Sequence, residues 1–187
     1  MYKTLIATVE NKPGVLNRVA SLFRRRNFNI DSLNVGRTEN PDVSRMTIVM
    51  DSQEVDARLV EANLYKLVNV IDVQDVTNQP AVLRELALIK VDAPAEKRAE
   101  IISLATVFKA KIVDVSADSL IMQITATSDR VDSLVELLRP TGITEMVRTG
   151  HVGMMRGDEE GARYTPGRHA DGYTQFKAQD VDPALGV

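Results

Sequence analysis

Residues 2–23 read YKTLIATVENKPGVLNRVASLF, and this stretch determines much of the expected fold. Its first part, Tyr2–Glu10, has the composition of a β-strand and ends at Asn11-Lys12-Pro13-Gly14, a turn signal. Apolar residues then recur with the 3.6-residue period of a helix, at Val15, Leu16, Val19, Ala20 and Phe23. The stretch therefore predicts a strand, a tight turn and an amphipathic helix in direct succession.

The residues that follow complete a pattern of six elements. Two strands, Asn29–Thr38 and Val43–Asp51, are separated by Glu39-Asn40-Pro41-Asp42, whose turn-forming residues predict a hairpin. A second helix is expected over Ser52–Val68 and a further strand over Val70–Thr77. The predicted order is strand, helix, strand, strand, helix, strand.

The same order recurs in the second half of the chain. The expected elements are a strand Arg84–Val91, a helix Ala95–Phe108, a hairpin of Lys111–Val115 with Leu120–Thr127, a helix Asp129–Leu138 and a last strand Ile143–Val152. This internal repeat predicts an α+β fold of two tandem ferredoxin-like (βαββαβ) units. We expect one domain over residues 1–79 and a second over residues 80–156.

Residues 157–187 differ from both units. The stretch from residue 156 onward holds five of the ten glycines and shows neither helical nor strand periodicity. We expect a flexible tail, which either docks on a partner or extends into solvent. Its anchors in the first case would be Tyr164, Tyr173 and Phe176.

The composition limits the classes of function. The 187 residues carry 23 Lys and Arg against 26 Asp and Glu, for a formal charge of −3, and include two histidines and no cysteine. Without cysteine the chain forms no disulfide, thiolate metal site or thiol nucleophile, and it suits a reducing cytoplasm. A mildly acidic chain is not expected to bind nucleic acid broadly. No apolar run approaches the roughly 20 residues of a membrane span.

Catalytic motifs are missing from the sequence. It contains no phosphate-binding glycine loop followed by Lys-Ser/Thr, no G-x-S-x-G and no histidine pair at metal-ligand spacing. These observations disfavour a self-contained enzyme, and we expect no catalytic and no metal-ligating residue. The basic triplet Arg24-Arg25-Arg26 closes the first predicted helix, where cations complement the helix dipole. A nucleic-acid contact is the less favoured alternative.

The Asn11–Leu16 turn carries the most chemical information. Pro13 fixes one dihedral angle, and Gly14 lets a ligand approach the backbone closely. A helix that begins here would direct free N–H groups and its positive dipole end at an anion such as a carboxylate, and Asn11 can both donate and accept. The alternative is a turn that only joins strand to helix. The corresponding turn of the second unit, Asp92-Ala93-Pro94-Ala95, lacks glycine, which points to a ligand site in the first unit alone.

Three segments resemble a known family: NKPGVLNRVASLF (11–23), NFNIDSL (27–33) and SRMTIV (44–49). They are similar to the small, regulatory subunit of acetolactate synthase (acetohydroxyacid synthase). The similarity is dense through residues 2–78, where that family has an amino-acid-sensing ACT domain, and looser to about Arg156. The resemblance implies a non-catalytic chain without its own cofactor. It would activate a cytoplasmic large subunit carrying thiamine diphosphate, Mg and FAD, in the synthesis of valine, leucine and isoleucine.

The resemblance also implies an effector site, in which the feedback inhibitor valine binds where two ACT domains of a homodimer meet. The implied residues are Asn11, Gly14, Val15, Leu16, Asn29 and Ile30. The first four would hold the carboxylate and ammonium groups of valine, and the last two would come from the neighbouring subunit. In the sheet order expected for this fold the second strand is an edge, so pairing two such edges would create that geometry.

Two other functions stay open. A free-standing ACT-type sensor could regulate another enzyme or transcription, although no helix-turn-helix segment is visible for reading DNA. A purely structural subunit would bind no effector. If the chain does bind a large subunit, we expect the second unit and the tail to make that contact.

Overall fold

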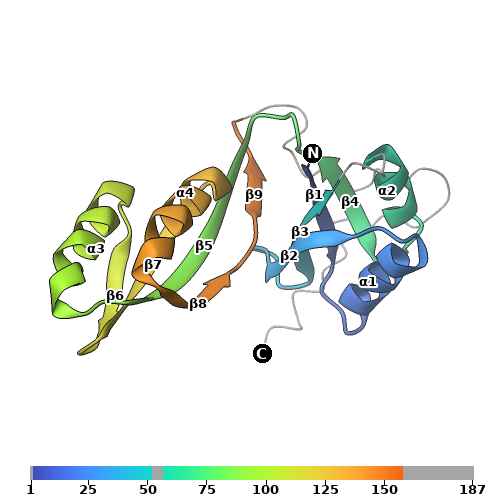
Figure 1. Cartoon of the computed structure of the whole chain (residues 1–187). Helices are drawn as coiled ribbons and strands as arrows, with labels where there is room; N and C mark the ends of the chain where they lie inside the picture. Colours follow the sequence, from blue (N-terminus) through green and yellow to red (C-terminus); the bar gives the residue numbers. More distant parts are fainter. Residues whose placement is uncertain (1, 52–56, 158–187) are drawn as a thin grey trace. The chain divides into compact units, whose positions relative to one another are not determined.

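The computed structural model of the chain describes residues 2–51 and 57–157, which form two compact units (Figure 1). Residues 2–82 and 153–157 belong to the first unit, and Leu83–Val152 form the second. The predicted tail lies outside the described residues except for Gly157, and so does the predicted start of the second helix, residues 52–56.

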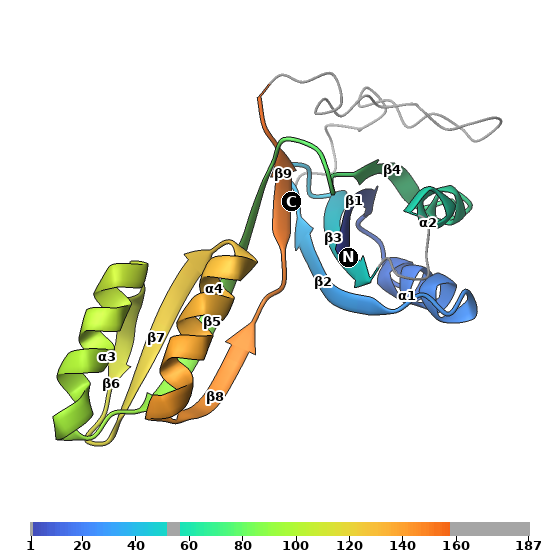
Figure 2. The same ribbon diagram turned by 45° about the horizontal axis from the view of Figure 1, so that its top comes forward.

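The first unit is a four-stranded antiparallel sheet with both helices on one face (Figure 2). The strand order is β2-β3-β1-β4, so β2 is an edge. Apolar residues from alternate positions of β1 and β3, such as Leu5 and Ile48, pack against Val19 and Phe23 of the first helix and Val60 of the second. Its elements are β1 (Tyr2–Glu10), α1 (Val15–Arg25), β2 (Ile30–Arg37), β3 (Val43–Asp51), α2 (Ala57–Leu64) and β4 (Val70–Asp75).

The second unit repeats this arrangement, with strand order β6-β7-β5-β8. A further short strand, β9, pairs with β5, and only its first residue, Val152, is counted in the second unit. Its core lies between the sheet and both of its helices and is entirely aliphatic in its fully buried part, as Ile89, Met122 and Leu134 illustrate. The elements from β5 onward are β5 (Ala81–Asp92), α3 (Ala95–Phe108), β6 (Lys111–Val115), β7 (Ser119–Ala126), α4 (Ser128–Leu138), a 3-10 turn (Arg139–Thr141), β8 (Ile143–Arg148) and the short strand β9 (Val152–Met155).

The predicted α+β fold with two βαββαβ units is confirmed, and α3 and β6 have the predicted bounds. Three predictions of element length were wrong. The strand expected over Arg84–Val91 is β5, which begins earlier, at Ala81, and ends at Asp92. The last strand, expected over Ile143–Val152, ends at Arg148 because Gly150 adopts φ +74°, a left-handed conformation that interrupts an extended chain. The second helix, expected to reach Val68, ends at Leu64, after which the backbone tightens into short-range hydrogen bonds such as Leu67 N–H to Leu64 O at 2.9 Å.

Candidate functional site

Gly14 is the residue that caps α1, and its conformation explains the need for glycine. Its φ of +83° lies in the left-handed region, where an L-residue is strained. A Cβ built on Gly14 would meet no atom of the chain within 4 Å. The space beside the backbone is therefore open, so glycine is required by the dihedral angle and leaves room for a ligand.

The first turn of α1 offers backbone donors. Among the described residues, no acceptor faces the N–H groups of Gly14 and Leu16, as expected for the first residues of a helix. The Val15 N–H, in contrast, is not free: it donates to Lys12 O at 3.3 Å, because the Pro-Gly turn folds back on itself. No acidic residue occupies the first turn, so the positive end of the helix dipole is not neutralised from within.

Asn11 is held by the hairpin between β2 and β3. Its Nδ2 donates to Pro41 O and its backbone N–H donates to Asp42 O, both at 2.7 Å. These bonds orient the side chain and leave Oδ1 without a partner among the described residues. Asn11 is thus prepared to accept a hydrogen bond, which suits an ammonium group better than a carboxylate.

Asn29 and Ile30 lie far from this turn within one chain. Ile30, at the start of β2, pairs with Met50, which in turn pairs with Lys3 at the beginning of β1. The turn follows Glu10 at the other end of β1. Lys3 and Glu10 are seven residues apart along β1, which corresponds to roughly 23 Å at about 3.3 Å per residue. The structure therefore brings Asn11 and Gly14–Leu16 together but places Asn29 and Ile30 at the opposite end of the same sheet.

A hydrogen-bonded clamp that the sequence did not indicate supports the turn. Arg18 Nη1 donates to Asn69 Oδ1 at 2.7 Å, and Asn69 Nδ2 donates to Glu10 Oε2 at 2.5 Å. The backbone N–H of Glu10 also donates to Asn69 O at 2.9 Å. These contacts join the end of β1 to the second turn of α1. The only sequence signal was an asparagine just before a predicted strand, which does not reveal its partners.

Two residues at the second helix of the first unit, Glu61 of α2 and Tyr65 just after it, have shifted pKa values. Burial raises the pKa of Tyr65 to about 12; its hydroxyl accepts from Val73 N–H at 3.0 Å and lies 3.2 Å from Asp72 Oδ1. Burial, and then the nearby Asp75 and Asp72, raise the pKa of Glu61 above its usual value. None of these residues belongs to the Asn11–Leu16 turn.

In the second unit, His151 Nε2 lies 2.5 Å from Ser128 Oγ, but Nδ1 has no hydrogen-bond partner among the residues that the structure describes. A nucleophilic serine needs a histidine oriented by a third group, so this pair lacks a catalytic arrangement. Within residues 2–51 and 57–157, no group of three or more acidic, histidine or cysteine side chains could hold a metal ion. No helix in that part of the chain is long and apolar enough to cross a membrane.

Comparison with known proteins identifies the family. Residues 5–72 match the model of the AHAS small subunit-like ACT domain, and residues 84–157 match that of the small subunit of acetolactate synthase. The chain is 51% identical over 160 residues to the probable acetolactate synthase small subunit of Archaeoglobus fulgidus, covering 86% of this chain and 100% of that protein. It is 44% identical over 163 residues to the Bacillus subtilis small subunit, covering 87% and 95%.

A solved structure agrees with these relatives. The crystal structure of the acetolactate synthase small subunit from Thermotoga maritima aligns with a TM-score of 0.78 at 39% identity, over 84% of this chain and 98% of that one. The family that the three sequence segments resemble is thereby confirmed. The chain belongs to the family of acetolactate synthase small subunits, and its first unit carries the ACT domain of that family.

Proposed function

We propose that this small subunit binds and activates the catalytic large subunit of acetolactate synthase and makes it subject to feedback inhibition by valine. Membership in the family implies a large catalytic partner, and the ACT domain supports a regulatory role. The thiamine diphosphate, Mg and FAD of the reaction would reside in the large subunit, and both chains would act in the cytoplasm.

The observation that carries the proposal is the polarity of the Asn11–Leu16 turn. An α-amino acid presents a carboxylate that accepts hydrogen bonds and an ammonium group that donates them. The N–H groups of Gly14 and Leu16 supply donors at the positive end of α1, and Asn11 Oδ1 supplies an acceptor held in place by Pro41. One turn thus offers hydrogen-bond partners for both the carboxylate and the ammonium group of an amino acid.

The distance between this turn and Asn29 favours a site shared by two copies of the chain. The edge strand β2 has one free side in the described sheet. Two antiparallel β2 strands would place the start of one beside the end of the other, and the end of β2 adjoins the turn because Arg37 pairs with Ser44 next to Val43, the partner of Glu10. Asn29 and Ile30 of one copy would then approach the turn of its partner.

Inhibition would follow from linkage. If valine binds the less active arrangement of the holoenzyme more tightly, it shifts the population toward that arrangement. A pocket distinguishes one methylene by only about 1–3 kcal/mol, so leucine and isoleucine are expected to bind more weakly than valine.

The test is an acetolactate assay with the large subunit alone, with this chain added, and with valine added to the mixture. We expect stimulation by the chain and inhibition by valine only when the chain is present. Calorimetric titration of valine into the isolated chain separates a sensor from a purely structural subunit. Absence of stimulation, or acetolactate formation by this chain alone, would contradict the proposal.

A further inference from the structure

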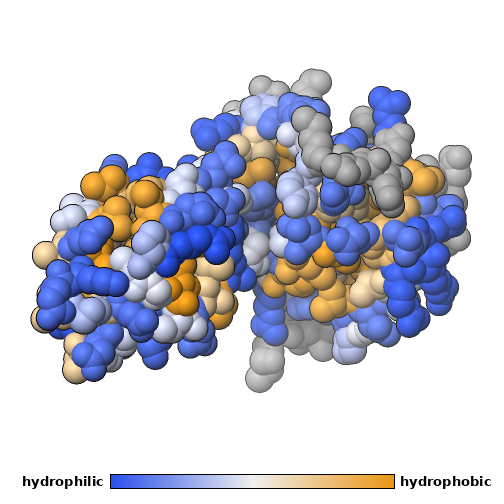
Figure 3. Space-filling model, in the orientation of Figure 1, coloured by the Kyte–Doolittle hydropathy of each residue, from blue (hydrophilic) through white to orange (hydrophobic). Residues whose placement is uncertain are grey.

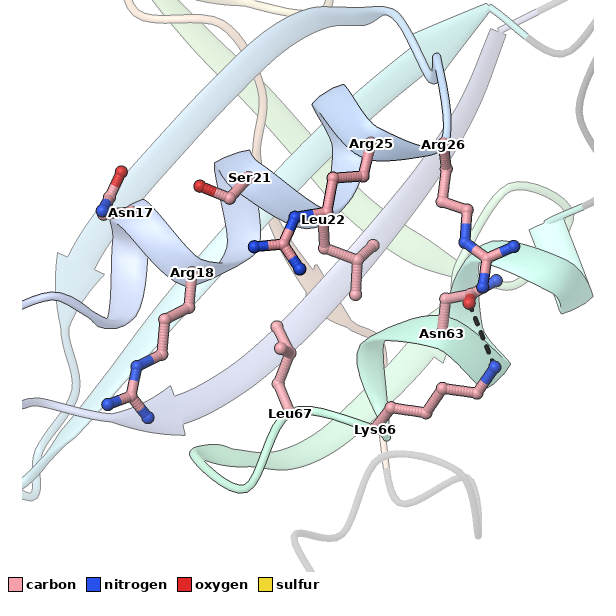
Figure 4. A pocket seen from close by; sticks show the side chains of 9 residues that line it. All are labelled: Asn17, Arg18, Ser21, Leu22, Arg25, Arg26, Asn63, Lys66 and Leu67. Carbon is pink, nitrogen blue, oxygen red and sulfur yellow. Dashed lines mark hydrogen bonds between the residues drawn. The ribbon is translucent and has the colours of Figure 1, made fainter.

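A surface groove of about 460 Å³ lies between α1 and α2 of the first unit, and none of its lining residues belongs to the Asn11–Leu16 turn (Figure 4). Nine described residues line it, of which four are cationic and none is acidic, although the whole chain has a formal charge of −3. The cationic residues are Arg18, Arg25, Arg26 and Lys66. Figure 3 shows the outer side of α1 as a hydrophilic surface.

Helix dipoles explain only part of this arrangement. Arg24 and Arg25 in the last turn of α1, and Lys66 just after α2, complement the negative ends of their helices. Arg18 is the fourth residue of α1, where a dipole does not favour a cation. The two helix ends together contribute roughly one negative charge, so four positive side chains leave a clear excess. The groove is therefore cationic beyond what its helices require.

Most of the hydrogen-bond donors in the groove are unused. Arg18 donates to Asn69 Oδ1 at 2.7 Å, and Lys66 Nζ donates to Asn63 Oδ1 at 3.2 Å. Within the described part of the chain, the guanidinium groups of Arg25 and Arg26 make no ion pair and no hydrogen bond, and each carries five donors. Figure 4 shows the Arg25 side chain extending along the groove rather than away from it.

The size and chemistry of the groove favour a small anion. Its volume lies in the range of about 300–1,000 Å³ typical of small-molecule sites, whereas a stable protein interface needs about 800 Å² from each partner. Arginine forks match phosphate oxygens in a bidentate manner. The half-buried Leu22 and Leu67 offer apolar contact to an uncharged part of a ligand. We infer that this groove binds a small molecule carrying two or more phosphate groups.

The test titrates orthophosphate, pyrophosphate and tripolyphosphate into the full chain by calorimetry, at fixed physiological ionic strength and without divalent cations. We expect one tripolyphosphate per chain and an affinity that rises with each added phosphate, because the cations are spread over two helices. The double variant Arg25→Ala/Arg26→Ala should weaken tripolyphosphate binding at least tenfold. Both side chains are exposed, so circular dichroism should show an unchanged fold.

Arg24→Ala is the matched control, because Arg24 is a neighbouring exposed cation that does not line the groove. It should change the tripolyphosphate affinity less than twofold. Valine titrations of the same variants should be unaltered, which keeps this test separate from the proposed effector site. The inference is overturned if tripolyphosphate does not bind, if Arg24→Ala weakens it as much as the double variant, or if an acidic hexapeptide displaces it at lower concentration.

Discussion

The turn before α1 and the turn before α3 occupy the same place in the two units. Each is fixed by an equivalent main-chain hydrogen bond to the hairpin of its own unit. Asn11 N–H donates to Asp42 O at 2.7 Å, and Ala93 N–H donates to Asp118 O at 2.8 Å. Apart from this shared hydrogen bond, the two turns differ in length. Three residues, 12–14, separate Asn11 from α1, whereas Pro94 alone separates Ala93 from α3. The first turn thus has room for a left-handed glycine that the second lacks.

The arginines at the fourth position of α1 and α3 also act differently. Arg98 reaches back over its own turn and donates to the carbonyl oxygens of Ala93 and Ser116, both at 3.0 Å, and also to that of Ala117. Arg18 turns to Asn69 instead, and the hairpin is held by Asn11. In the second unit, therefore, the Arg98 side chain occupies the carbonyl oxygens around the turn.

The comparison shows how one topology yields both a turn that is open to a ligand and a turn that is closed by a side chain of its own unit. Ala93 is fully buried and has no polar side chain, and α3 carries Glu96 in its first turn. A carboxylate there counteracts the attraction of the helix end for a second anion. The first turn keeps open donors, an oriented acceptor and no acid. Only the first unit is therefore expected to sense an amino acid.

The largest expected effect comes from placing a charge in the first turn. Gly14→Asp should weaken valine binding by at least about a hundredfold, because a like charge against the ligand carboxylate costs several kcal/mol. It should also remove valine inhibition of the holoenzyme. Isothermal titration of valine into the variant measures the loss.

Gly14→Asn is the matched control for that charge. Asparagine tolerates the left-handed conformation better than most residues, and the space beside Gly14 is open within the chain. Gly14→Asn should therefore bind valine much more tightly than Gly14→Asp. Equal losses in the two variants would show that charge is not the cause, and full binding by Gly14→Asp would refute the site.

A smaller effect is expected from Asn11→Ala, which removes the proposed acceptor for the ammonium group. A hydrogen bond to a charged group contributes about 1.5–3 kcal/mol, so valine affinity should fall by about tenfold or more. Asn40→Ala is the control, because Asn40 Oδ1 accepts from Asp42 N–H in the same hairpin at 3.0 Å without contacting Asn11. If both variants lose affinity equally, hairpin geometry rather than direct contact is responsible.

Arg98→Ala should separate the turn before α3 from the proposed binding turn before α1. The loss of its hydrogen bonds to three carbonyls should lower the free energy of unfolding by about 1–2 kcal/mol, as urea denaturation would show. Valine affinity should stay within twofold of the wild type. Arg18→Ala should lower both stability and valine affinity, since Arg18 holds Asn69 against Glu10. A change in valine affinity in Arg98→Ala would contradict the claim that the turn before α3 takes no part in valine binding.

The smallest expected effect is a pH dependence of stability that comes from Tyr65 of the first unit. The folded pKa of Tyr65 is about 12, above its usual 10.0, mainly because of burial. The stability that this neutral hydroxyl contributes is complete below pH 10 and is lost as the pH rises through 12. This rise in pKa corresponds to about 2.7 kcal/mol in full. Solvent screening of the half-buried side chain reduces it, so the stability advantage of the wild type over Tyr65→Phe should shrink by about 1–2 kcal/mol over this range. A constant difference between pH 9 and 12 would contradict the assigned shift.

The repeated order of elements could be predicted from sequence because each element has its own period and its own turn residues. Val15, Val19 and Phe23 mark the buried face of α1, and all three are buried. The lengths of the last strand and of α2 could not be predicted, because they depend on the φ of Gly150 and on turn hydrogen bonds after Leu64.

The candidate site was only partly readable from sequence. Gly14 and the start of α1 could be placed from the Pro-Gly turn, since both are local features. The bond from Asn11 to Pro41 joins residues 30 positions apart, and that from Arg18 to Asn69 joins residues 51 apart. Such contacts depend on the register of the sheet, which the sequence pattern does not specify. The same register places Ile30 level with Lys3 rather than with Glu10.

The central claim, that the valine site combines the Asn11–Leu16 turn of one copy with Asn29 of another, is tested most directly by mixing two defective chains. Gly14→Asp disables the turn's half of the proposed site. Asn29→Tyr places a bulky side chain in the half that the other copy contributes, at a position that is exposed in the single chain. Each variant alone should bind no valine. After unfolding and refolding together, random pairing should restore about one quarter of the wild-type valine sites, because each mixed dimer contains one intact site. No restored binding in a mixture that contains mixed dimers would contradict the account.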